Sequence, residues 1–291
     1  MQRVVRRFPF RARPAGPCRI RPGVHESLTE RLAERTTSSE GTTVRHATSL
    51  LLGTALILSA GAPAKSAADT AYPEHERIAK SFSLASGSRI EISTIAGSVE
   101  IDTTSGRTAD VEVVRAAPTR RELDCGAIVI EQVGPTLRIR SENRCQTIRS
   151  SHVVKLSVPR DVNLSLRNIA GHVRIGSTDG MVRLESIAGH VEAEGLREAR
   201  MVSLANGLAL TVSDLSARGI SVISVTGAID LDVGPRADAE VITRSVAGHI
   251  DNEVRGARII EIDDANQRAV IGSGRGKIEI ISVVGTIRIH G

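Results

Sequence analysis

One short phrase, Ser186-Ile187-Ala188-Gly189-His190-Val191, returns along the chain at a nearly fixed spacing and constrains the fold more than any other feature. Between residues 163 and 252 its glycine recurs after 18, 18, 20 and 21 residues. A period near 20 residues indicates stacked repeats, because one such unit cannot bury its apolar face alone. With one outlying copy on each side, the repeat glycines are Gly97, Gly171, Gly189, Gly207, Gly227, Gly248 and Gly285.

Apolar and polar residues alternate on both sides of the glycine, as in two half-buried strands. Glycine at a fixed place suits a corner that needs positive φ or close backbone approach. We expect one apolar side chain to fill each corner and another to start the inward series after the glycine. The expected corner residues are Ile169, Ile187, Val225 and Val246, and the expected first inward residues are Val173, Val191, Ile229 and Ile250.

The expected core of the stack is narrow and aliphatic. Aromatic residues make up only 1% of the chain, and there is no Trp. If the copies stack in order, equivalent residues lie about 4.8 Å apart. Arg174 should then pair with Glu192 on the outer face, whereas Asp230 would face Asp251.

The N-terminal region looks like an export signal preceded by a leader. Residues 1–46 are rich in Arg, Ser, Thr and Pro, and residues 47–64 then run without a charge. The apolar centre is short for a membrane span, so 47–68 is interpreted as a signal peptide rather than a membrane anchor, with cleavage after Ala64 or Ala68. Either the true start lies near Val44 or the signal has a long natural n-region.

The basic character of the chain belongs to this leader. Residues 1–68 contain 11 Lys and Arg against 4 Asp and Glu, whereas residues 69–291 contain 27 against 29. The exported part therefore gives no charge argument for nucleic acid, and it lacks clusters of basic and aromatic residues. We expect no nucleic-acid partner, and membrane contact only through the transient signal segment.

A hairpin is expected between two cysteines. After a linker at 69–80, an N-terminal β part spans 81–160, and the β-strand repeats span 161–291. Within the first part, strand-like residues 127–131 and 136–140 flank a Gly-Pro turn, with Cys125 and Cys145 at equal distances from it. In an oxidising compartment these two cysteines should form a disulfide bond. Cys18, in the leader, has no evident partner.

Candidate chemical sites are weak. His172 and His190 hold the same repeat position and would stack on adjacent rungs, close enough for a metal, but an exposed strand position tolerates any polar residue. Asp230 with Asp232, and Glu192 with Glu194, form outward carboxylate pairs of the kind that a solvated face carries. The glycine-rich stretch 272–277 fails the phosphate-loop pattern and predicts a turn. We therefore expect no catalytic residues, metal or cofactor.

The order of these motifs resembles the bacterial putative-adhesin family, a group of β-strand-repeat envelope proteins with a domain of unknown function. The resemblance covers residues 82–291. It rests on Leu156-Ser157-Val158-Pro159 before the repeats, on the repeats themselves, and on Gly274-Arg275-Gly276-Lys277-Ile278 followed by Val284-Gly285-Thr286-Ile287. The resemblance implies an all-β, right-handed parallel β-solenoid, or β-helix-like stack, with a less regular N-terminal β cap.

The same resemblance implies an exported protein of the periplasm or cell surface. Because the chain lacks a nucleophile motif and has almost no aromatic residues, we expect no enzymatic activity. The expected partner is an envelope protein or a glycan, and exposed end rungs would allow self-association. Two alternatives stay open: a carbohydrate-active enzyme on a β-helix scaffold, and a periplasmic partner of a signalling system. Convergent carboxylates in a cleft would favour the enzyme, whereas smooth ladders would favour a binding protein.

Overall fold

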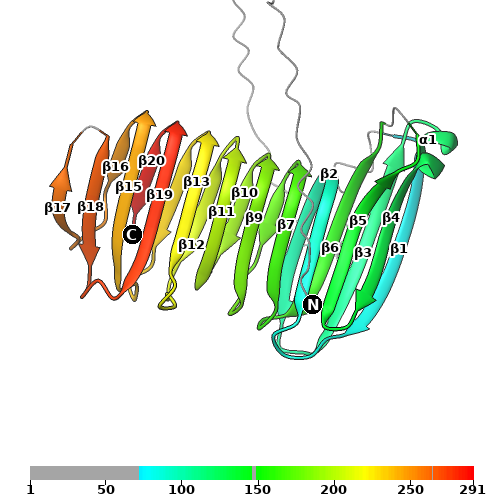
Figure 1. Ribbon diagram of the computed structural model, residues 1–291, viewed down its shortest axis with the longest axis horizontal. Helices are drawn as coiled ribbons and strands as arrows, with labels where there is room; N and C mark the ends of the chain where they lie inside the picture. The colour runs from blue at the N-terminus through cyan, green and yellow to red at the C-terminus, as the bar shows by residue number, and fades with distance from the viewer. Residues whose placement is uncertain (1–71, 146–148, 264) are drawn as a thin grey trace, which may run out of the picture. The chain divides into compact units, whose positions relative to one another are not determined.

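The computed structural model describes residues 72–145, 149–263 and 265–291 (Figure 1). The expected leader (1–46) and signal peptide (47–68) lie outside these ranges. The described chain is all-β apart from one short helix. Its elements are β1 (Glu74–Ser83), β2 (Arg89–Thr104), β3 (Thr108–Ala117), α1 (Arg120–Cys125), β4 (Gly126–Val133), β5 (Thr136–Asn143), β6 (Ser151–Pro159), β7 (Asn163–Ala170), β8 (Val173–Ile175), β9 (Met181–Ala188), β10 (Val191–Glu194), β11 (Glu198–Ala205), β12 (Leu208–Val212), β13 (Ile220–Thr226), β14 (Ile229–Val233), β15 (Ala239–Ala247), β16 (Ile250–Asn252), β17 (Arg258–Ile262), β18 (Asn266–Ile271), β19 (Gly276–Val284) and β20 (Ile287–His290).

Each repeat contributes one strand before its corner and one strand after it, and both kinds of strand pair in parallel. The pre-corner ladder consists, in order, of the first half of β2, then β7, β9, β11, β13, β19 and β15. The post-corner ladder consists of the second half of β2, then β8, β10, β12, β14, β20 and β16. The phrase found in the sequence is thus a structural repeat.

The core between the ladders is built from stacked aliphatic side chains. Ile90 of β2 is followed in register by Leu164, Val182, Ala199, Ile220, Ile278 and Val241, all buried. The expected first inward residues Val173, Val191 and Ile229 are buried, and Ile250 is half-buried. Burying one such side chain contributes about 1.5–3 kcal/mol, so the aliphatic stack stabilises the fold without aromatic residues.

In the first four copies a residue in the left-handed region makes the corner. Thr94, Asn168, Ser186 and Ser203 have φ between 54° and 60°. This single reversed residue interrupts the alternation, so that the next residue turns inward. Ile95, Ile169, Ile187 and Leu204 are therefore buried at the corner.

The last three copies turn differently, and the expectation that Val225 and Val246 fill the corner is wrong. Ser224, Ser245 and Ser282 are absent from the residues with positive φ, so alternation continues through the corner. The serines are buried, whereas Val225, Val246 and Val283 are 44%, 76% and 41% exposed.

The repeat glycines stack on one another's backbones. A Cβ on Gly171 would collide with the carbonyl oxygen of Gly97, and one on Gly189 with that of Gly171. Gly207 does not belong to this series, because Ala205 and Leu208 stand opposite Ala188 and Val191. Asn206, with φ of 82°, therefore occupies the glycine position, and Gly207 occupies the histidine position.

The copies do not stack in chain order. The final copy, β19 and β20, lies between β13–β14 and β15–β16, as Figure 1 shows. Arg288 consequently stands between Asp230 and Asp251, which we expected to face each other. The insertion replaces a like-charge contact by two opposite-charge neighbours. Beyond β15, the antiparallel strands β18 and β17 continue the pre-corner ladder.

The N-terminal part extends both ladders, first by parallel pairing of β6 and β5 with β2 and then by antiparallel pairs. β6, β3 and β1 continue the post-corner ladder outward from β2, and the β4–β5 hairpin continues the pre-corner ladder. β1 covers most of the linker expected at 69–80, so that expectation is wrong from Glu74 onward. Its alternation is hidden because only Ile78 and Phe82 supply large apolar side chains, and both lie at an edge of the sheet.

The hairpin carries the expected disulfide bond between Cys125 and Cys145, whose Cα atoms are 5.5 Å apart. The helix α1, which ends at Cys125, was not expected. Its local signal is the pair Thr119 and Glu122, because the Thr119 hydroxyl accepts a hydrogen bond from the Glu122 backbone amide. Within the described residues, no helix is both long and apolar enough to cross a membrane.

Candidate binding face and groove

The outer face of the post-corner ladder carries a row of charges that alternate in sign. Lys155 lies 3.3 Å from Glu100, and Arg288 lies 3.8 Å from Asp230. Opposite charges on neighbouring strands contribute roughly 0.2–1 kcal/mol per pair and penalise a shift in register. We call these residues the charge row: Glu112, Lys155, Glu100, Arg174, Glu192, Ala209, Asp230, Arg288 and Asp251.

Arg174 and Glu192 are neighbours in this row, as the repeat spacing predicts. Their ionic contacts, however, lie elsewhere. Arg174 donates to Asp102 over 3.4 Å, whereas Glu192 lies 3.8 Å from His172 and 3.6 Å from His190. The Glu192 carboxylate therefore faces two histidines rather than a guanidinium.

His172 and His190 stack ring on ring, with centroids 5.8 Å apart and planes inclined by 13°. Both side chains are partly exposed, and Glu192 lies beside them. Across the described ranges, no group of three or more His, Cys, Asp and Glu side chains could hold a metal ion. The third copy of this histidine, His249, is separated from the pair by the corners that contain Gly207, Ala228 and Thr286.

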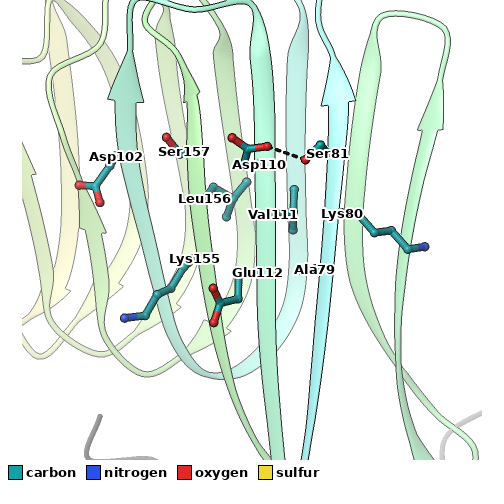
Figure 2. A pocket seen from close by; sticks show the side chains of 10 residues that line it. All are labelled: Ala79, Lys80, Ser81, Asp102, Asp110, Val111, Glu112, Lys155, Leu156 and Ser157. Carbon is teal, nitrogen blue, oxygen red and sulfur yellow. Dashed lines mark hydrogen bonds between the residues drawn. The ribbon is translucent and has the colours of Figure 1, made fainter. Parts of the chain in front are cut away.

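At the end of the charge row formed by Glu112 and Lys155, the strands β1, β3, β6 and β2 form an open groove of about 380 Å³ (Figure 2). One line of side chains crosses the four strands as Ser81, Asp110, Ser157 and Asp102. A second line consists of Ala79, Glu112 and Lys155. Ser81 donates to Asp110 over 2.6 Å. The groove thus offers hydroxyls, carboxylates and an amine on a rigid sheet, which is chemistry suited to hydrogen-bonding a polar ligand.

Sequence reasoning missed this groove. It arises from the antiparallel pairing of β3 with β6, which brings Glu112 opposite Lys155 across 43 residues of chain. The repeat phrase carries no information on that pairing, because neither strand belongs to a regular copy.

The expected turn at 272–277 is present, and Asp238 organises it. The Asp238 carboxylate accepts hydrogen bonds from the backbone amides of Ser273, Gly274 and Arg275 and from the side chains of Ser273 and Arg275. The side-chain donors, Arg275 first, hold the pKa of Asp238 well below its usual range. Since these donors belong to the turn, Asp238 has a structural role.

Comparison with known proteins gives weak similarity only. No protein-family model matches the chain, and no curated protein matches it. Among solved structures, a protein described as a putative cell adhesion protein from Clostridium sporogenes is 11% identical, with 75% of this chain and 99% of that chain covered and a TM-score of 0.46.

Two further solved structures show similarity of the same low level. A putative adhesin from Bacteroides fragilis is 14% identical, covering 74% of this chain and 97% of that one, with a TM-score of 0.40. A putative lipid binding protein from Parabacteroides distasonis is 12% identical, covering 73% and 96%, with a TM-score of 0.26. Adhesin is also the name of the family that the sequence motifs resemble. All three TM-scores lie below 0.5, and we infer neither fold nor function from them.

Proposed function

We propose that this chain is an exported binding protein of the bacterial envelope, without enzymatic activity, that folds as a right-handed β-solenoid. The observation that carries the proposal is the groove over β1, β3, β6 and β2, at the end of the charge row. It presents Ser81, Asp110, Ser157 and Lys155 on paired strands, whose backbone is fixed by the ladder. Such a surface recognises a partner by hydrogen bonds, and we propose a glycan or a protein of the envelope as that partner.

Export is supported by the disulfide bond, because such bonds persist in oxidising compartments. Intact-mass measurement on protein from its native host tests export directly. We expect a mass that corresponds to cleavage after Ala64 or Ala68, and a gain of about two daltons on reduction. A full-length mass with both thiols free would contradict the proposal.

Binding is tested on a glycan array and on purified cell-wall material, with a variant of the groove. Lys155→Glu places an acid beside Glu100 and Glu112, and we expect it to abolish binding to whichever ligand the unmodified protein retains. The control is Arg268→Glu on β18, which makes the same charge change far from the groove along the ladder. Equal binding by both variants would exclude the groove.

One observation favours the carbohydrate-active enzyme as a second candidate. Asp110 and Asp102 both stand opposite Ser157, on either side of the groove. A general acid, however, needs surroundings that keep a carboxyl protonated near neutral pH, and both of these side chains are exposed. Release of reducing sugar by the unmodified protein, lost in Asp102→Asn or Asp110→Asn, would establish the enzyme instead.

A further inference from the structure

Three arginines stand on successive strands of the pre-corner ladder, on its outer face. They are Arg167 of β7, Arg183 of β9 and Arg200 of β11, and all three are exposed. Arg183 lies directly opposite Arg200 in the parallel pair, whereas Arg167 stands opposite Glu185 of β9. Like charges in direct opposition destabilise a sheet, so the pair of Arg183 and Arg200 opposes folding unless an anion compensates it.

The charge row on the post-corner ladder differs from this arrangement. There, basic residues alternate with acidic ones. The flanking arginines of the pre-corner face are also paired, since Arg138 lies 3.1 Å from Glu91 and Arg140 contacts Glu142. Among the described residues, the structure records no ion pair within 4 Å for Arg167, Arg183 or Arg200. We call these three residues the arginine row.

Two hollows adjoin the arginine row, and Ser165 of β7 lines both. One, of about 350 Å³, contains Ser93, Arg138, Arg140 and Arg167, together with the carboxylates of Glu91 and Glu131. The other, of about 120 Å³, contains Asn163, Met181 and Arg183. Hydroxyl and amide groups therefore lie between the guanidinium groups, on a surface that runs across several strands.

We propose that this face binds an anionic polysaccharide, at a second site that is separate from the groove of the proposed function. A guanidinium group binds carboxylate, sulfate or phosphate with two parallel hydrogen bonds, and Ser and Asn side chains bond sugar hydroxyls. A chain of repeating charges follows a row across strands better than a compact anion does. Nucleic acid fits less well, because residues 83–291 contain no Phe, Tyr or Trp on which bases could stack.

Calorimetric titration with a short heparin oligosaccharide tests the proposal, using the purified protein and two double variants. Arg183→Gln with Arg200→Gln removes two charges from the arginine row, and we expect the affinity to fall at least about tenfold, because the charge-assisted hydrogen bonds of both guanidinium groups are lost. Arg174→Gln with Arg288→Gln removes two charges from the opposite face and should change the affinity less than about twofold. Added salt should weaken binding of the unmodified protein.

Three outcomes would overturn the inference. Equal losses in the two double variants would show attraction by net charge alone. Tighter binding of duplex DNA or of anionic phospholipid vesicles than of heparin, lost in the arginine-row variant, would reassign the ligand class. Failure of both heparin and polygalacturonate to bind, while Lys155→Glu still loses its ligand on the glycan array, would overturn this inference and leave the proposed function standing.

Discussion

His152 of β6 lies directly opposite Arg115 of β3, and both side chains are buried. Burial lowers the pKa of His152 and the nearby Arg115 lowers it further, against a hydrogen bond between the histidine Nδ1 and the Ala96 carbonyl oxygen. Arg115 donates to the carbonyl oxygens of Leu123 and Gly126 and pairs with Glu76. Arg115 therefore connects β1, α1 and β4 to β3.

The lowered pKa of His152 predicts that acid destabilises the protein. The unfolded histidine gains its proton as the pH falls through its ordinary pKa of about 6.5, whereas the folded one resists until a lower pH. The free energy of unfolding should therefore decrease as the pH falls below that value. Urea denaturation on either side of it measures the effect. His152→Leu should reduce this dependence of the free energy of unfolding on pH, and an unchanged dependence would contradict the assignment.

Removal of the disulfide bond should destabilise the N-terminal part. Cys125→Ser with Cys145→Ser opens a link across 20 residues of sequence, and we expect a loss of about 3 kcal/mol in the free energy of unfolding. Urea denaturation of the variant, compared with the unmodified protein, measures it. Because reductant should reproduce the loss only in the unmodified protein, an equal response of both would contradict the assignment.

A side chain at a stacked glycine should be costly. In Gly171→Ala the new Cβ meets the Gly97 carbonyl oxygen, and the residue keeps φ of 144°, so we expect a loss of at least about 2 kcal/mol. Gly106→Ala is the matched control, because its Cβ would have no neighbour closer than 3.7 Å. Thermal denaturation measures both variants, and equal melting temperatures would contradict the stacking of the glycines.

The two kinds of corner predict opposite responses to the same truncation. Ile187→Ala removes a buried side chain and should cost about 2–5 kcal/mol. Val246→Ala, at the corresponding place in the phrase, should change stability by less than about 0.5 kcal/mol, because Val246 is exposed. Chemical denaturation measures both changes, and equal losses of the free energy of unfolding would contradict the exposed position of Val246.

The buried serines of the last copies should also differ from one another. Ser224 donates over 3.3 Å to the Leu204 carbonyl oxygen, so Ser224→Ala should cost about 0.5–1.5 kcal/mol. Ser282 stands next to it in register, but its buried hydroxyl has no hydrogen-bond partner among the residues that the structure describes. Ser282→Ala should therefore be neutral or stabilising. Melting temperatures of the two variants distinguish these outcomes. A larger decrease for Ser282→Ala than for Ser224→Ala would show that the Ser282 hydroxyl forms the more stabilising hydrogen bond.

The sequence predicts those parts of the fold that depend on residues close together in the chain. Alternation predicts the strands, and a symmetric turn predicts the hairpin with its Cys125–Cys145 bond. Ser186 and Ser224 show where local information ends, because both are serines in the same phrase. Ser186 adopts φ of 57°, and the following Ile187 is buried. Ser224 is itself buried, and the following Val225 is exposed. The identity of the residue does not select between these backbones.

The order in which distant strands pair cannot be predicted from the repeat spacing. The charge row includes Glu100 with Arg174, which the stacking of copies predicts. It also includes Lys155 opposite Glu112 and Arg288 between two aspartates, which follow from antiparallel pairing and from the inserted final copy. Those placements are determined by the contacts of whole strands rather than by residues near them in the chain.

The inserted final copy also determines the order in which the molecule can assemble. Because β19 and β20 occupy the place between β13–β14 and β15–β16, those earlier strands have no native neighbour on that side until the later segment arrives. Growth of the stack one rung at a time from the N-terminus must therefore stop at β14. In a chain that emerges progressively, from a ribosome or from a translocation channel, the contacts in the middle of the stack form last. They form only when β19 and β20 insert between the strands that emerged earlier.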